Sequence, residues 1–271
     1  MKPRQLVALE AAYAKSGVEL TLWAEWAKTI GLDTFRGESQ YLGQLNFGAT
    51  REQYAVELAY VRRERPEWLD QLEEDGTFGA ITFDFDGKPV SRDLLDSILE
   101  VGFLHDALDL GSTPLDILDI GAGYGRFAHR LLELFSAHEV YCVDAVPIST
   151  LVCERYLGYR GSHAHVVGLP DLDEVLSAGV DLACNIHSWS ECPRTAIDFW
   201  LGWLADHDVR NLFIVPHDET FSCMEPDKTR PTYLPLLESH GYKLATSRPK
   251  YPAGVEGAFP TTYYLFERGS R

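Results

Sequence analysis

The first third of the chain has apolar residues at the three- and four-residue spacing that is typical of amphipathic helices. This spacing predicts helices in three segments, over residues 6–15, 20–30 and 51–74. Apolar and polar residues then alternate over residues 80–90 up to and beyond the turn pair Asp86-Gly87, which predicts a short strand or hairpin. Helical spacing returns over residues 90–108. The region is therefore predicted to be mainly helical.

From Pro114 onward, short apolar runs alternate with helical stretches. Strands that alternate with helices of roughly 10 to 15 residues indicate βαβ units and a parallel sheet. We therefore predict a doubly wound, Rossmann-like α/β fold. The last apolar run, residues 261–268, follows a loop rich in proline and glycine that cannot supply a crossover helix. It should form an antiparallel last strand.

This change of pattern divides the chain into two regions. Residues 1–110 should form a helical N-terminal cap, and residues 111–271 should form the ligand-binding core. A cap could close over an acceptor molecule and exclude water. A dimerisation layer is the alternative role of the N-terminal region, so a homo-oligomer remains open.

Composition and charge narrow the class of partner. The 271 residues are 45% hydrophobic and 24% charged, as in a globular protein, and the formal net charge is −17. Such an acidic field repels nucleic acid and anionic membrane surfaces. No stretch has the apolar pattern of a signal peptide or a membrane span, and the five cysteines form no CxxC pair. We expect a soluble, cytoplasmic protein with reduced thiols.

The most informative segment runs from Leu115 to Phe127, where an apolar strand leads into a glycine-rich turn and a helix. Glycines stand at positions 121, 123 and 125, but Arg126 occupies the position where a dinucleotide-binding fingerprint needs glycine. Asp119 precedes the turn, and a carboxylate there suits an ammonium or sulfonium better than a pyrophosphate. Asp144 ends the next strand, where an acid can accept hydrogen bonds from ribose hydroxyls.

The motif DIGAGYG over residues 119–125, followed by VYCVDA over residues 140–145, resembles motifs I and II of class I S-adenosylmethionine-dependent methyltransferases. The resemblance extends over residues 114–268. It implies that the glycine turn holds the methionine end of S-adenosylmethionine, that Asp144 holds the ribose, and that Gly168–Asp171 line the adenine. The residues assigned to the cofactor are Asp119, Gly121, Ala122, Gly123, Gly125, Asp144, Ala145, Leu169 and Asn185.

Residues 185–191 follow the fourth strand and should face the same crevice as the glycine turn. Transfer of a methyl group to a hydroxyl needs alignment and a base that removes the proton. His187 is the first candidate for that base, although a core histidine is the alternative reading of this residue. Glu191 is a carboxylate within reach of the same place, either as an orienting partner of the base or as a substrate ligand. His217, after the fifth strand, could be the base instead or could bind substrate hydroxyls.

The same residues also permit a metal site. His187, Glu191 and His217, together with Asp218 and Glu219, offer the hard ligands that Mg²⁺ prefers, but their spacing is not diagnostic of a metal. Magnesium therefore remains an alternative.

Three further motifs resemble the bacterial sugar O-methyltransferase family: residues 86–104, GAGYGR at 121–126 and N-x-x-S-x-x-E at 185–191. The chain departs from that pattern in reading DAVP at residues 144–147. The resemblance implies O-methylation of a sugar or glycoside, a small-molecule acceptor. Aromatic and amide side chains that could cover such an acceptor are Tyr41, Gln44, Trp189, Tyr233, Tyr251 and Phe259. Methylation of another small molecule on nitrogen or carbon, a non-catalytic S-adenosylmethionine-binding protein, and a nicotinamide-dependent oxidoreductase are the alternatives.

Overall fold

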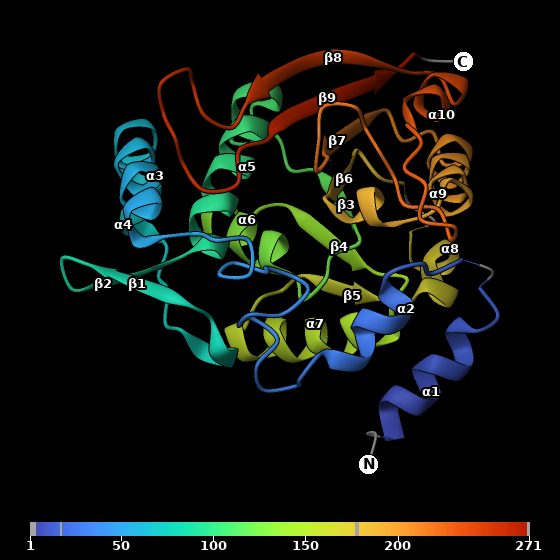
Figure 1. Ribbon diagram of the computed structural model, residues 1–271. Helices are drawn as coiled ribbons and strands as arrows, with labels where there is room; N and C mark the ends of the chain where they lie inside the picture. The colour runs from blue at the N-terminus through green and yellow to red at the C-terminus, as the bar shows by residue number, and fades with distance from the viewer. Residues whose placement is uncertain (1–3, 17, 177–178, 270–271) are drawn as a thin grey trace.

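A seven-stranded sheet forms the centre of the protein, in the spatial order β5-β4-β3-β6-β7-β9-β8 (Figure 1). The computed structural model describes residues 4–16, 18–176 and 179–269. Strands β3 to β7 are parallel, whereas β9 runs antiparallel between β7 and β8. The predicted sheet, with its antiparallel last strand, is confirmed. Its strands are β3 (Asp116–Ile120), β4 (Glu139–Val143), β5 (His165–Val167), β6 (Leu182–Ile186), β7 (Asn211–Val215), β8 (Tyr242–Pro249) and β9 (Thr262–Arg268).

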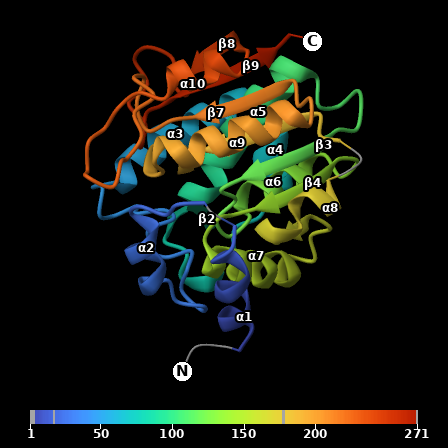
Figure 2. The same cartoon turned by 90° about the vertical axis from the view of Figure 1, so that its right-hand side faces the viewer.

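Helices cover both faces of this sheet, because successive residues of each strand point to opposite sides. On β3, Ile117 packs into the apolar layer formed with α5, α6 and α7, whereas Leu118 packs into the layer formed with α8, α9 and α10. Figure 2 shows α9 on one side of the strands and α5 on the other. The helices are α5 (Arg92–Leu108), α6 (Arg126–Leu134), α7 (Pro147–Arg160), α8 (Leu172–Val175), α9 (Arg194–Asp206) and α10 (Leu234–Ser239).

The N-terminal region is helical only in part. The helix predicted over residues 20–30 is too long: the segment forms one turn of α-helix and a 3₁₀ turn, and residues 30–50 follow as turns and bends. The helix predicted over residues 51–74 divides at Arg65, because a residue before proline disfavours helical geometry and Pro66 begins a new helix. The elements are α1 (Arg4–Tyr13), α2 (Trp23–Trp26), η1 (Ala27–Thr29), α3 (Arg51–Glu64), α4 (Pro66–Gln71), η2 (Thr77–Gly79), β1 (Thr82–Phe85) and β2 (Lys88–Ser91).

The cysteines and the lengths of the helices can be compared with the expectations from the sequence. All five cysteines are unbridged thiols, and four of them are buried. None of the helices in the described ranges has the length and apolar run required to cross a membrane.

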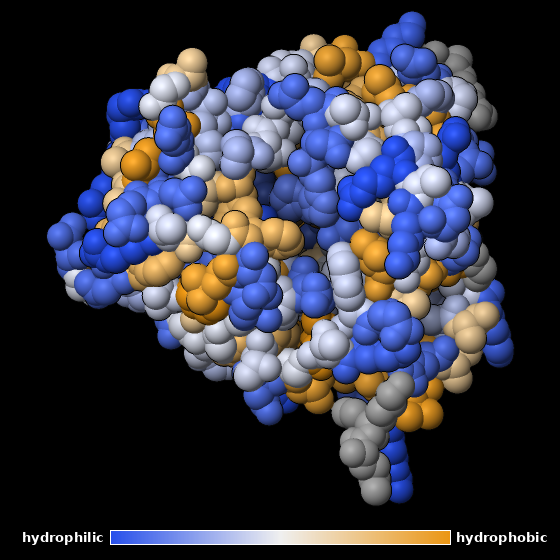
Figure 3. Space-filling model, in the orientation of Figure 1, coloured by the Kyte–Doolittle hydropathy of each residue, from blue (hydrophilic) through white to orange (hydrophobic). Residues whose placement is uncertain are grey.

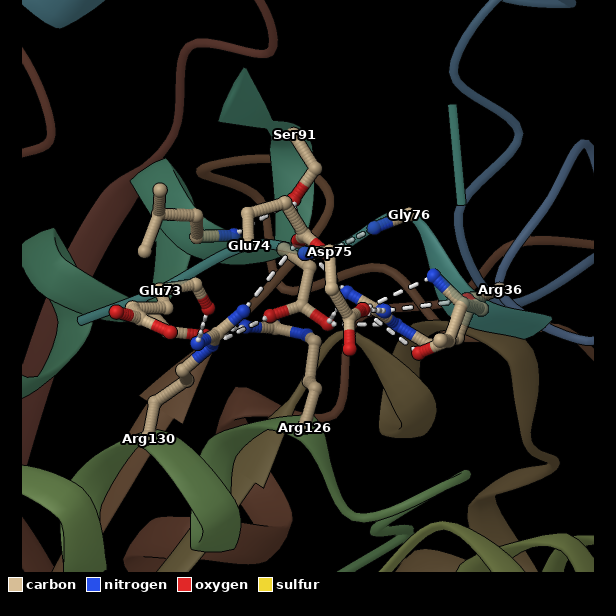
Figure 4. A network of polar contacts seen from close by, with 12 residues as sticks. Arg36, Glu73, Glu74, Asp75, Gly76, Ser91, Arg126 and Arg130 are labelled. Carbon is tan, nitrogen blue, oxygen red and sulfur yellow. Dashed lines mark hydrogen bonds and ion pairs between the residues drawn. The ribbon is translucent and has the colours of Figure 1, made fainter. Parts of the chain in front are cut away.

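A buried charge cluster joins the N-terminal region to the core. It consists of two guanidiniums, Arg36 and Arg130, and two carboxylates, Glu74 and Asp93, and all four side chains are 0% exposed. Arg36 and Arg130 reach Glu74 from opposite sides, with N···O distances of 2.7 and 3.3 Å (Figure 4). Both also contact Asp93, each at 3.1 Å, and Asp93 accepts the hydroxyl of Tyr124 at 2.8 Å.

Burial of these charges is tolerated because each carboxylate meets two guanidiniums. The guanidinium charges hold the pKa of Asp93 below its usual range although burial opposes them. The cluster thereby connects residue 36, the loop before β1, helix α5, helix α6 and the glycine turn.

We predict that Asp93→Asn destabilises the protein by about 3–5 kcal/mol, because two buried guanidiniums lose one of their two shared counter-charges. The free energy of unfolding in urea at pH 7 measures this. Asp70→Asn is the matched control, since Asp70 pairs with Lys88 at the surface and should change stability by less than about 0.5 kcal/mol. Equal effects of the two substitutions would contradict the role given to the cluster.

Candidate active site

A cavity of about 520 Å³ lies at the carboxyl ends of β3, β4, β6 and β7. Its walls come from the glycine turn after β3, the ends of β4 and β6, residues 20–47 and residues 259–261. Figure 3 shows that this face of the molecule is hollowed near its centre, with apolar side chains on one side of the hollow and hydrophilic side chains on the other. A crevice at this edge of a doubly wound sheet is the expected place for a ligand.

The glycine turn forms one wall of the cavity through Gly121, Ala122 and Gly123. The backbone N–H groups of Gly121 and Ala122 donate to the carbonyl of Val143, which fixes the turn against the end of β4. Gly121 has a φ of +74°, and a Cβ there would lie 2.1 Å from Ser188 Oγ. No other residue fits this position without displacing that side chain.

Gly125 has a different environment from the other two glycines. It precedes α6 and does not line the cavity, and a Cβ at this position would lie 2.9 Å from Cys153 Sγ on α7. The structure therefore places Gly125 at a close contact between helices. Its predicted contact with a cofactor remains a prediction.

Asp144 lies at the end of β4 and lines the cavity beside Ala145. One carboxylate oxygen accepts the backbone N–H of Gly123 at 3.0 Å, and the other accepts that of Val146 at 2.8 Å. Burial raises the pKa of Asp144 to about 6, although both hydrogen bonds oppose this change. Each oxygen has a further lone pair with which it can accept a ligand hydroxyl.

Asp119 lies on β3 behind the glycine turn and does not line the cavity. Its side chain is buried, and Oδ2 has no hydrogen-bond partner among the described residues. Burial raises the pKa of Asp119 to about 7, and Arg126 opposes the increase. Arg126 is itself held by Glu100 through two hydrogen bonds of 2.7 and 2.9 Å. An unpaired buried carboxyl oxygen is costly, and a cation near the turn would offset that cost.

Two more predicted cofactor residues, Leu169 and Asn185, do not line the cavity. The N–H of Leu169 donates to the hydroxyl of Tyr13 on α1 at 3.1 Å, and that hydroxyl also pairs with Thr150 at 2.7 Å. Asn185 donates to the carbonyl of Ile120 at 2.9 Å and accepts the N–H of Trp189 at 3.1 Å, which ties β6 to β3. Their cofactor contacts remain predictions.

The three predicted catalytic residues all line the cavity. His187 has a φ of +67° and a ψ of −32°, an uncommon conformation outside glycine, and its N–H donates to Val215 at 2.7 Å. Its ring centroid lies 5.1 Å from that of His217, and its Nδ1 is buried without a hydrogen-bond partner in the described part of the chain. Burial lowers the pKa of His187 well below its ordinary value, so the ring is neutral at pH 7.

Glu191 is a mostly buried carboxyl group in the 3₁₀ turn η4 (Ser188–Glu191), with 14% of its side chain exposed. Its Oε2 accepts the indole N–H of Trp23 at 2.7 Å, and its Oε1 lies 3.6 Å from His217 Nε2. Burial raises the pKa of Glu191 to about 7, whereas burial and Arg92 lower the pKa of His217 to about 4. At neutral pH Glu191 is therefore half ionised and the imidazole of His217 is neutral, so the two side chains do not form an ion pair.

The remaining predicted ligands of a metal are engaged elsewhere. Asp218 accepts the hydroxyls and N–H groups of Thr220 and Ser222, and Glu219 accepts the hydroxyl of Thr262. Within the described residues, no group of three His, Cys, Asp or Glu side chains could hold a metal ion. Magnesium gains no support from the geometry.

The aromatic and amide side chains predicted to cover an acceptor lie in three different places. Tyr41, Trp189 and Phe259 line the main cavity. Tyr251 lines a neighbouring cavity of about 260 Å³, which shares His217 with the first. Gln44 and Tyr233 are buried and line neither cavity.

The sequence missed Trp23, Trp26 and Arg92, which also line the main cavity. The sequence shows helical spacing around Trp23, but this spacing does not indicate that Trp23 contacts Glu191.

Comparison with known proteins gives structural similarity only. No protein-family model matches the chain, and a sequence search of the curated proteins gives no significant match. One similar structure is the magnesium protoporphyrin IX methyltransferase of Synechocystis PCC 6803 with bound SAM, at 14% identity and a TM-score of 0.48, over 82% of this chain and 99% of that one. Another is an S-adenosylmethionine-dependent methyltransferase of Clostridium acetobutylicum, at 10% identity and a TM-score of 0.48, over 65% and 92%. A third is a SAM-dependent methyltransferase of Leishmania major, at 16% identity and a TM-score of 0.47, over 64% and 72%.

Proposed function

We propose that the protein is an S-adenosylmethionine-dependent methyltransferase that acts on a hydroxyl group of a small molecule. One observation carries the proposal: a single cavity has the glycine turn and Asp144 on one side and a carboxyl group with a raised pKa, Glu191, on another. The first pair suits a nucleoside with a cationic amino-acid end. The carboxyl group of Glu191 suits removal of a proton from an acceptor.

The residues around the turn fit the cofactor. Asp144 has lone pairs for the ribose hydroxyls, Gly121 and Gly123 keep the wall open, and the unpaired Oδ2 of Asp119 favours a positive charge nearby. When bound, S-adenosylmethionine supplies a methyl group on a positively charged sulfur.

Glu191 is the best candidate for the base. Its carboxyl is half ionised near pH 7, which is the condition under which general-base catalysis is efficient. The neutral ring of His217 lies 3.6 Å from Glu191, and the ring of His187 lies next to that of His217. Both rings line the cavity and can orient an acceptor through hydrogen bonds. His187, the first choice from the sequence, is a weaker base here because its pKa is lowered.

The acceptor is proposed to be a sugar or glycoside. The resemblance to the sugar O-methyltransferases suggests this class, and the cavity wall adds two amide side chains, Gln40 and Asn46, and two aromatic rings, Tyr41 and Phe259. Amides bind hydroxyl groups, and aromatic faces pack against the C–H surfaces of sugars. The N-terminal region acts as a cap in this proposal, since residues 20–47 supply one wall.

We predict that S-adenosylhomocysteine raises the melting temperature of the protein and that NAD does not. A ligand at ~100 times its dissociation constant adds about 2.7 kcal/mol of stability, which differential scanning fluorimetry detects. Asp144→Ala should remove most of this shift, because the ribose loses its carboxylate partner. Asp70→Ala, at an exposed position, should retain it. A shift with NAD alone would overturn the proposal.

We predict that the rate of methyl transfer rises with pH and levels off above pH 7. The carboxylate form of Glu191 is the active one, so below its pKa of about 7 the rate should fall about tenfold per pH unit. Glu191→Gln should lower kcat by about 10²- to 10⁴-fold and leave binding of S-adenosylhomocysteine nearly unchanged.

The assay measures methyl transfer from S-adenosylmethionine to a panel of sugars and glycosides between pH 5.5 and 9. Glu67→Gln, an exposed glutamate on α4, is the control and should behave like the parent protein. A pH profile unaffected by Glu191→Gln would exclude Glu191 as the base.

A further inference from the structure

The candidate base is contacted by a segment from the opposite end of the chain. Trp23 donates its indole N–H to Glu191 Oε2 at 2.7 Å, and the hydroxyl of Thr21 donates to the backbone carbonyl of Glu191 at 2.6 Å. The side chain and the backbone of Glu191 are thus both held by residues more than 160 positions away. Two hydrogen bonds from one short segment define both the position of the residue and the rotation of its carboxyl group.

Trp23 is itself fixed by contacts that lead back to the cofactor wall. Its ring packs against Tyr41, with centroids 5.1 Å apart, and the hydroxyl of Tyr41 pairs with Ser149 at 2.8 Å. A Cβ on Gly123 would lie 3.2 Å from the Tyr41 ring. A continuous series of contacts therefore runs from the glycine turn through Tyr41 and Trp23 to Glu191.

The hydrogen bond from Trp23 makes the two oxygens of Glu191 different. Oε2 is occupied by the indole N–H, whereas Oε1 lies 3.6 Å from His217 Nε2, beyond hydrogen-bond distance. A proton taken from an acceptor is therefore best received on Oε1. Trp23 can only donate, so it stabilises the carboxylate and cannot compete for that proton.

Other charged and titratable groups also act on Glu191. His217 lies at the end of β7, Asp144 at the end of β4 raises the pKa of the carboxyl, and Arg92 and Arg230 lower it. The hydrogen bond from Trp23 has a larger lowering effect on this pKa than either arginine. Loss of the indole N–H should thus raise the pKa of Glu191.

We propose that Trp23 is a positioning residue for methyl transfer: its indole N–H holds Glu191 so that Oε1 receives the proton of the acceptor hydroxyl. This inference rests on the proposed function. The acceptor O–H bond breaks and its proton passes to Oε1. The acceptor oxygen bonds to the methyl carbon while the carbon–sulfur bond breaks, and that electron pair remains on sulfur. The N-terminal segment is thereby part of the active site.

A test that needs no acceptor follows the indole N–H groups by NMR in protein labelled with ¹⁵N-tryptophan. The Trp23 resonance, identified by its absence in Trp23→Phe, should shift with pH around a midpoint near 7, where Glu191 ionises. The shift should disappear in Glu191→Gln. A Trp23 resonance that does not move, or that moves equally in Glu191→Gln, would overturn the proposal.

The kinetic test compares Trp23→Phe with Trp68→Phe. Phenylalanine keeps an aromatic ring at residue 23 but removes the N–H. We expect kcat to fall at least about tenfold, the pH midpoint of kcat to rise, and binding of S-adenosylhomocysteine to change by less than about threefold. Trp68 packs against His105 and Phe135, away from the cavity, so Trp68→Phe should match the parent.

The two readouts separate the two proposals. A pH-dependent Trp23 resonance in a protein that transfers no methyl group would contradict the proposed function and keep the pairing of Trp23 with Glu191. An unchanged pH midpoint and kcat in an active Trp23→Phe variant would overturn the positioning role alone.

Discussion

The buried charge cluster around Asp93 is the interaction on which the rest of the arrangement depends. It unites charges from four separate segments, and none of its four side chains is exposed. Because an unpaired buried charge is so unfavourable, these segments can pack together only in the register that pairs all four groups. Tyr124 extends this constraint into the glycine turn through its hydrogen bond to Asp93. The N-terminal region and the glycine turn are consequently positioned by the same interaction.

Carboxyl groups in the cavity and behind the glycine turn, unlike those of the charge cluster, are not paired with any guanidinium that the structure describes. Asp93 is surrounded by guanidiniums and keeps a low pKa. Asp119, Asp144 and Glu191, by contrast, are buried with no cation from the described residues in contact, and burial raises their pKa values to about 7, 6 and 7. The core thus neutralises its charges internally, but the site leaves three carboxyl groups under-compensated. Perturbed carboxyls gathered in one place are typical of functional sites, and they favour a ligand that brings positive charge and hydroxyl donors.

The sequence was most informative where local pattern and tertiary structure agree. The glycine turn and Asp144 follow apolar strands, and parallel topology brings the ends of those strands to one edge, so their meeting in the cavity was predictable. Leu169 and Asn185 stand at equivalent strand ends, yet their polar groups are taken by Tyr13 and by β3. Helical spacing overestimated the segment around Trp23, because tertiary contacts decide how short segments fold.

Trp23 illustrates why the remainder of the site could not be read from the sequence. Its partner is 168 residues away, and neither the periodicity around residue 23 nor the motif around residue 191 contains information on the other. The contact exists because Arg36 ties the following segment to the core and Tyr41 ties it to α7. A base that depends on such a contact acquires its full hydrogen-bond environment only when the N-terminal segment is in place. Under the proposed function, this contact restricts deprotonation of an acceptor to molecules in which the N-terminal segment lies against Glu191 and completes the wall opposite the glycine turn.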